Sequence, residues 1–210
     1  MDASTVRTWM SAIAASVSEQ RDYLVQLDAA IGDGDHGINM TRGFTAVVRA
    51  LEAQGDSPPG TLLILAGKTL VSSVGGASGP LWGTALRRAG RALGEEPTFD
   101  AAKLSAALDA ALAGIVDLGA ANPGDKTMVD ALTPAATTLR QRVDAGDSIQ
   151  AAVHAAVDSA EEGKLATEPM QARKGRASYL GERSVGHVDP GAASTVLVMR
   201  ALEHAVAREG

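Results

Sequence analysis

The chain has 210 residues, a net charge of −6, a pI near 5.2 and no cysteine. These values exclude disulfides and thiolate metal sites, and they argue against a nucleic-acid-binding surface. Only two each of Trp, Tyr and Phe occur, and apolar residues rarely alternate with period two, so a sheet has little support. We expect one all-α domain over residues 1–210.

The first residues show no basic segment leading into an apolar one, and no apolar run reaches about 18 residues. We therefore expect no signal peptide, no membrane partner and a cytoplasmic location.

Apolar residues recur at helical spacing along most of the chain. The pattern predicts eight helices, at residues 4–28, 36–54, 58–74, 81–93, 99–118, 127–143, 147–165 and from 189 to the C-terminus. Expected helix starts are Ser57 with Pro58, Thr127 with a capping partner at Asp130, Asp147 with Gln150, and Asp189 with Pro190.

Three aspartates, Asp28, Asp33 and Asp35, lie within eight positions after the first predicted helix, and Gly32 and Gly34 interrupt them. Residues two apart in an extended loop point the same way, so the three carboxylates can converge. Converging carboxylates favour a hard cation, and we interpret the loop as a Mg²⁺ site. Asp and Gly are also common turn residues, and the spacing suits an EF-hand Ca²⁺ loop poorly.

The helix predicted to begin at His36 directs its N-terminus back at these aspartates. A helix N-terminus attracts phosphate, so carboxylate-held Mg²⁺ beside it suggests a nucleotide. A second glycine-rich loop, 75–80, allows close backbone approach to a ligand, although a simple turn between helices explains it as well. It lacks the G-K-[ST] of a Walker A motif.

Residues 167–189 lose the helical periodicity and carry several basic side chains in an acidic chain. This segment is interpreted as a lid over an anion or, alternatively, as a solvated loop.

Eight helices with short connections imply antiparallel neighbours. Every second connection then falls at the same end of the bundle. Those four connections are the aspartate loop, the glycine-rich loop, the loop 119–126 and the basic segment, so we expect one site at that end.

Four motifs carry a resemblance that covers the chain essentially from end to end: I-G-D-G-D-H-G at 31–37, G-G-A-S-G-P-L-W-G at 75–83, G-D-K-T-M-V-D at 124–130 and K-G-R-A-S-Y-L-G-E-R-S-V-G-H-V-D-P-G at 174–191. The chain resembles the L subunits of dihydroxyacetone kinase (DhaL). The resemblance implies a closed up-and-down barrel of eight antiparallel amphipathic helices, with ADP or ATP and two Mg²⁺ ions at one end.

The resemblance also implies residue roles. Asp28, Asp33 and Asp35 match the metal ligands. The positions that match the nucleotide contacts are His36, Gly37, Ile38, Asn39, Ala77, Ser78, Gly119, Met128, Arg176, Asp189, Pro190 and Gly191. Arg176 would cover the phosphates and stabilise charge on the transferred group, and Trp82 stands where a tyrosine is frequent in the family.

The implied activity is phosphoryl transfer to dihydroxyacetone held on a separate K subunit (DhaK). In the phosphotransferase-linked branch, a further subunit (DhaM) rephosphorylates the bound ADP. The alternatives are the L subunit of an ATP-dependent triose or tetrose ketose kinase, and a regulatory nucleotide-binding module. A metal-dependent hydrolase lacks an identifiable general base.

Overall fold

The computed structural model describes residues 1–208, and this range contains helices and no strand. The helices are α1 (Ala3–Glu19), α2 (Arg21–Ile31), α3 (His36–Ala53), α4 (Pro59–Ser73), α5 (Ser78–Leu93), α6 (Ala101–Gly119), α7 (Met128–Asp144), α8 (Ile149–Ala166), the 3-10 helix η1 (Arg176–Ser184) and α9 (Pro190–Ala207). The all-α class predicted from the sequence is confirmed.

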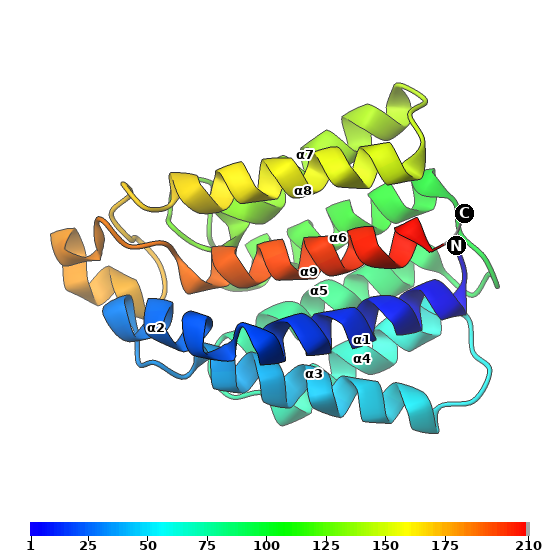
Figure 1. The fold of residues 1–210 in the computed structure, drawn as a ribbon, viewed down its shortest axis with the longest axis horizontal. Helices are drawn as coiled ribbons and strands as arrows, with labels where there is room; N and C mark the ends of the chain where they lie inside the picture. The colour runs from blue at the N-terminus through cyan, green and yellow to red at the C-terminus, as the bar shows by residue number, and fades with distance from the viewer. Residues whose placement is uncertain (209–210) are drawn as a thin grey trace.

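Eight of the described helices form a closed ring. From α3 to α9 each long helix packs on the next one, α1 packs on α3, and α9 packs on α1. Neighbouring helices of the ring run antiparallel, so the barrel is of the expected up-and-down type (Figure 1). The N-terminus and the end of α9 lie at one end of the barrel, and η1 lies at the other.

The first predicted helix, 4–28, is wrong as a single element. It is divided into α1 and α2 at Gln20, and α2 continues past Asp28 to Ile31. A β-carbon at Gly37 would overlap the carbonyl oxygen of Arg21, so the start of α3 lies directly against the break. From this break α2 extends beyond the ring toward η1, which it contacts (Figure 1).

Several helix starts also differ from the sequence prediction. The third helix begins at Pro59 with Pro58 as N-cap, one residue later than expected, and α5 begins at Ser78 instead of 81. Ser148, and not Asp147, caps α8. The capping box of Thr127 with Asp130 and the Asp189-Pro190 start of α9 are confirmed.

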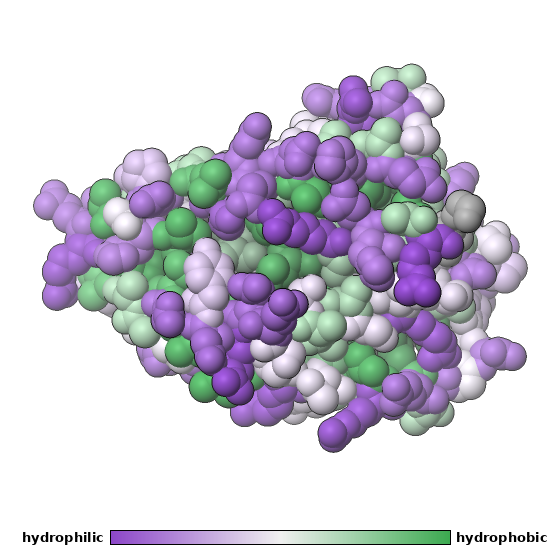
Figure 2. Space-filling model, in the orientation of Figure 1, coloured by the Kyte–Doolittle hydropathy of each residue, from purple (hydrophilic) through white to green (hydrophobic). Residues whose placement is uncertain are grey.

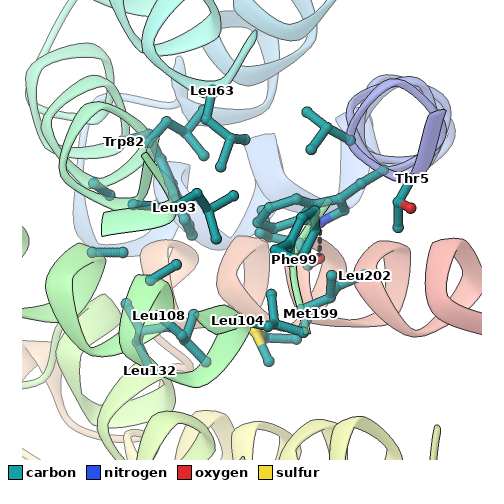
Figure 3. A pocket seen from close by; sticks show the side chains of 18 residues that line it. Thr5, Leu63, Trp82, Leu93, Phe99, Leu104, Leu108, Leu132, Met199 and Leu202 are labelled. Carbon is teal, nitrogen blue, oxygen red and sulfur yellow. Dashed lines mark hydrogen bonds between the residues drawn. The ribbon is translucent and has the colours of Figure 1, made fainter. Parts of the chain in front are cut away.

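The ring encloses an apolar core to which all eight helices contribute. Figure 3 shows part of it, where Trp82, Phe99 and Met199 close around a cavity of about 30 Å³. The Trp9 indole N–H donates to the carbonyl oxygen of Val198 at 2.9 Å, which satisfies the polar atom of a buried ring. The core therefore fixes the barrel and leaves polar chemistry to its ends.

The face in Figure 2 is mostly covered by hydrophilic side chains, with apolar residues between them. Over residues 1–208, every helix is too short or too polar to cross a bilayer.

Candidate functional site

The four connections at one end of the barrel line a single cavity of about 320 Å³. The expectation that they share one end is confirmed. Most of the predicted site residues line this cavity: Asp28, Asp33, Asp35, His36, Asn39, Ala77, Ser78, Gly119, Met128, Arg176, Asp189, Pro190 and Gly191. Gly37 and Ile38 lie outside the lining. The Ile38 side chain is exposed, and Gly37 instead permits the close packing of α2 on α3.

The carboxylates of Asp28, Asp33 and Asp35 converge, with one oxygen of each lying within 4.8 Å of the others. Asp28 is buried, whereas Asp33 and Asp35 are exposed at the cavity mouth. A β-carbon at Gly32 would overlap Oδ1 of Asp28, so the loop passes close to this carboxylate at a position without a side chain. Three oxygens at this separation match what a hard divalent cation needs, and their mutual repulsion favours one.

One oxygen of Asp28 holds the loop in shape. Its Oδ2 accepts hydrogen bonds from the backbone N–H of Asp35 at 2.9 Å and of His36 at 3.1 Å. Oδ1 is directed toward Gly32, inside the loop. Asp28 thus both fixes the start of α3 and offers an oxygen to the carboxylate cluster.

Arg176 on η1 reaches across the cavity mouth. Its guanidinium forms an ion pair with Asp33, with 2.9 Å between Nη2 and Oδ2. Below this pair, Ile31 of α2 packs with Ala172, Ala177 and Leu180 in a small second apolar cluster. This cluster docks η1 on α2, and it explains how residues far apart in the sequence become neighbours.

Helices α3, α5, α7 and α9 all begin at the cavity. Each N-terminus leaves backbone N–H groups without helical partners and carries a partial positive charge. Several such ends directed at one volume favour a phosphate chain there.

His36 connects three of these helix starts. Its Nδ1 lies 3.0 Å from Ser78 Oγ on α5, and its Nε2 lies 3.0 Å from Ser194 Oγ on α9. Burial lowers the pKa of His36, although Asp28 and Asp35 oppose this shift. A neutral imidazole at neutral pH suits this bridging position, and Ser194 is a partner that the sequence interpretation missed.

Asp189 caps α9, and its Oδ2 accepts the N–H of Ala192 at 2.7 Å. Burial is the main reason that the pKa of Asp189 is raised to about 7, and the nearby Asp130 carboxylate also raises it. The capping N–H of Ala192 and the ammonium of Lys126 act in the opposite direction. The side chain is therefore sensitive to the charges beside it.

The sequence interpretation assigned no role to Lys126, although it stands in the G-D-K-T motif and lines the cavity. Only 1% of its surface is exposed. In the sequence, Lys126 stands between the turn at Gly124 and the helix-capping Thr127. That pattern does not distinguish a buried lysine from an exposed one. Trp82 was noted only as a family departure, yet it lines both the core cavity and the site cavity.

The barrel and its cavity define a class: an all-helical ring with a carboxylate cluster and several helix N-termini at one end. Comparison with protein families gives a specific answer. The model of the DAK2 domain matches residues 30–204, and the chain belongs to this family.

Two curated relatives show how far the similarity extends. The chain is 45% identical to the PEP-dependent dihydroxyacetone kinase, ADP-binding subunit DhaL, of Escherichia coli strain K12, over 92% of each chain. It is 44% identical to the L-erythrulose 1-kinase of Mycolicibacterium smegmatis over 86% of its own length and 32% of that protein.

Among solved structures, the dihydroxyacetone kinase from C. freundii in complex with AMP-PNP and Mg²⁺ superimposes with a TM-score of 0.72 at 29% identity. The match covers 95% of the chain and 33% of the crystallised one, so the chain spans about a third of that kinase.

Proposed function

We propose that this protein is the nucleotide-binding subunit of a dihydroxyacetone kinase and that it transfers a phosphoryl group through Mg²⁺-bound ADP or ATP. The observation that carries the proposal is the convergence of Asp28, Asp33 and Asp35 beside four helix N-termini, within one cavity. The similarity to a relative named as an ADP-binding subunit supports it.

In this proposal Asp28, Asp33 and Asp35 hold two Mg²⁺ ions. Mg²⁺ held by these residues would supply positive charge that neutralises the charge on the transferred group. Three carboxylates offer six oxygens, and because Asp28 Oδ2 accepts two backbone N–H groups, the remaining oxygens would hold the ions.

The remaining residues would bind and orient the nucleotide. The start of α3, where His36 and Asn39 line the cavity, and the turn at Ala77 and Ser78 would attract phosphate oxygens through the partial positive charge of a helix N-terminus. Gly119 and Met128 supply a small and an apolar surface for the base and ribose, and Pro190 with Gly191 closes the other side. Arg176, which pairs with Asp33, would donate to the transferred group.

The proposed partners are a K subunit that holds dihydroxyacetone and a phosphotransferase protein of the DhaM type that rephosphorylates bound ADP. The name of the E. coli relative, a PEP-dependent kinase, supports this branch. A second candidate is the nucleotide-binding part of an ATP-dependent ketose kinase, which the erythrulose kinase similarity supports.

One experiment separates these candidates. The purified protein is analysed by mass spectrometry for bound nucleotide, then mixed with a K subunit, dihydroxyacetone and either the phosphoryl-carrier protein or isotopically labelled ATP. We expect ADP to remain bound and to be phosphorylated in place by the carrier. Exchange with free ATP in every turnover would select the ketose kinase, and absence of any nucleotide or transfer would remove both candidates.

A further inference from the structure

Residues 167–189, here called the cover segment, carry Arg176 to the cavity mouth while containing little regular structure besides η1. A segment of this length needs fixed ends if Arg176 is to stay near the carboxylates. The ends of the cover segment meet at Lys126, the buried lysine that the proposed function leaves without a role.

The Lys126 ammonium donates to three backbone carbonyl oxygens of the cover segment. Two belong to its beginning, Thr167 at 2.7 Å and Glu168 at 3.4 Å, and the third belongs to His187 near its end. An ammonium has three N–H donors and no acceptor, so three carbonyls satisfy it completely. A single side chain therefore joins both ends of the cover segment.

Other hydrogen bonds close the same base. The N–H of Asp189 donates to Thr167 Oγ1 at 3.0 Å, and the N–H of Gly186 donates to the carbonyl of Glu168 at 2.8 Å. The N–H of Arg173 donates to the carbonyl of Asp125, next to Lys126, at 3.0 Å. The cover segment is thus anchored to the loop between α6 and α7 at its base, and to α2 through the second apolar cluster.

The loop that presents Lys126 is itself held in an unfavourable conformation. Lys126 has a φ of 62°, in the left-handed region that residues with a β-carbon seldom adopt. The Asp130 carboxylate accepts the N–H groups of Gly124 and Thr127 and so fixes the loop on either side of Lys126. Backbone strain kept at a buried cation indicates that the position of the ammonium matters.

From these contacts we infer that Lys126 is a positioning residue for phosphoryl transfer: it closes the base of the cover segment and thereby holds Arg176 at the cavity mouth. The inference rests on the proposed function, because Arg176 matters only if a phosphoryl group binds there. Lys126 touches no reacting atom in this account. It acts through the carbonyls of Thr167, Glu168 and His187.

Lys126→Met tests the inference with little disturbance of the backbone. Methionine is unbranched and of similar length, and it meets the same unfavourable positive φ as lysine. It removes the ammonium donor from all three carbonyls, of which those of Thr167 and Glu168 keep the N–H groups of Met170 and Gly186 and that of His187 loses the Lys126 donor. We expect amide exchange in residues 170–187 to accelerate about tenfold or more, with the ring helices unchanged. Lys68→Met, which removes an exposed lysine of α4, is the matched control and should change neither quantity.

A double-mutant cycle distinguishes positioning from general stabilisation. Lys126→Met should lower the phosphoryl-transfer rate about tenfold or more in the unaltered protein, but less than about twofold when Arg176→Ala is already present. Equal losses in both backgrounds would mean that Lys126 does not act through Arg176, and would overturn the inference.

The failure of the inference and that of the proposed function remain distinguishable, because amide exchange needs no nucleotide. If the unaltered protein transferred no phosphoryl group, the proposed function would fail and the exchange result would still decide whether Lys126 anchors the cover segment. If Lys126→Met does not fold, amide exchange at Gly186 and Asp189 in the unaltered protein tests whether the base of the cover segment is anchored. We expect them to exchange at least about tenfold more slowly than those of 174–183, and equally fast exchange would refute the anchor.

Discussion

The interior of the barrel and its open end are built from the same helices but differ in the side chains that line them. The interior is lined by apolar side chains around a cavity of about 30 Å³, whereas the open end surrounds about 320 Å³ with carboxylates, helix starts and a few basic groups. Stability comes from the first region, through burial of apolar surface. The second region gathers carboxylates and helix starts, and it is where we propose that the nucleotide binds. The two regions should therefore be separable by mutation.

Removal of a carboxylate at the open end should have the largest effect on function. Asp35→Ala takes away one of the converging oxygens, and the Asp35 side chain makes no capping hydrogen bond on α3, so the helix loses little. We expect nucleotide and Mg²⁺ affinity to fall about a hundredfold or more while helical content is retained. Isothermal titration calorimetry and circular dichroism measure the two quantities.

The matched control for Asp35→Ala is Asp144→Ala, which removes an exposed carboxylate at the opposite end of α7. It should bind nucleotide normally. Wild-type affinity in the Asp35→Ala protein would contradict the assignment of the metal ligands.

Truncation of a side chain inside the barrel should lower stability and leave nucleotide affinity nearly unchanged. Phe44 is 1% exposed and belongs to the core, so Phe44→Ala loses transfer free energy and leaves a cavity. We expect a loss of about 3–5 kcal/mol in the free energy of unfolding, measured with urea. Nucleotide affinity per folded molecule should change less than about threefold. A large affinity loss without destabilisation would show that the two regions are not separable.

A pH dependence sharpens the comparison at the boundary of the two regions, where Asp189 is buried yet lines the site. Its pKa of about 7 lies well above the ordinary value of an aspartate carboxyl, 3.8. A raised carboxyl pKa means that the folded state binds the proton more tightly than the unfolded chain does. The resulting stability is present below about pH 4 and is lost as the pH rises toward 7.

Asp189→Asn keeps a capping side chain and removes this titration. The free energy of unfolding of the unaltered protein, relative to that of Asp189→Asn, should fall between pH 5 and pH 8 when both lack nucleotide. His36 titrates in both proteins and largely cancels in the difference. A difference that is flat or that rises with pH would indicate that Asp189 is ionised throughout.

The smallest effect is expected on the outer surface, which serves neither region. Arg140 of α7 pairs with Asp109 of α6 at 3.0 Å, and both side chains are substantially exposed. Arg140→Met should change the free energy of unfolding by at most about 1 kcal/mol and leave nucleotide affinity unaltered. Thermal unfolding, measured with and without about 0.5 M salt to screen the surface ion pair, provides the check.

The sequence by itself determined the all-helical class and the starts of α3, α7 and α9, because these depend on local preferences. Apolar residues at helical spacing mark the buried faces, and Asp189 with Pro190 or Thr127 with Asp130 satisfies helix N-terminal groups within a few residues. The alternation of up and down helices then placed Asp33, Ser78, Met128 and Arg176 at one end before any contact was known.

Only the tertiary structure decided how those pieces meet. The break at Gln20 depends on the approach of Gly37 to Arg21, and the Arg176–Asp33 pair depends on the apolar contact between Ile31 and the cover segment. Lys126 finds its three carbonyls 41 to 61 positions further along the chain. Such contacts join residues whose local patterns are independent, so their geometry follows from the packing of the whole barrel and not from any one stretch of sequence.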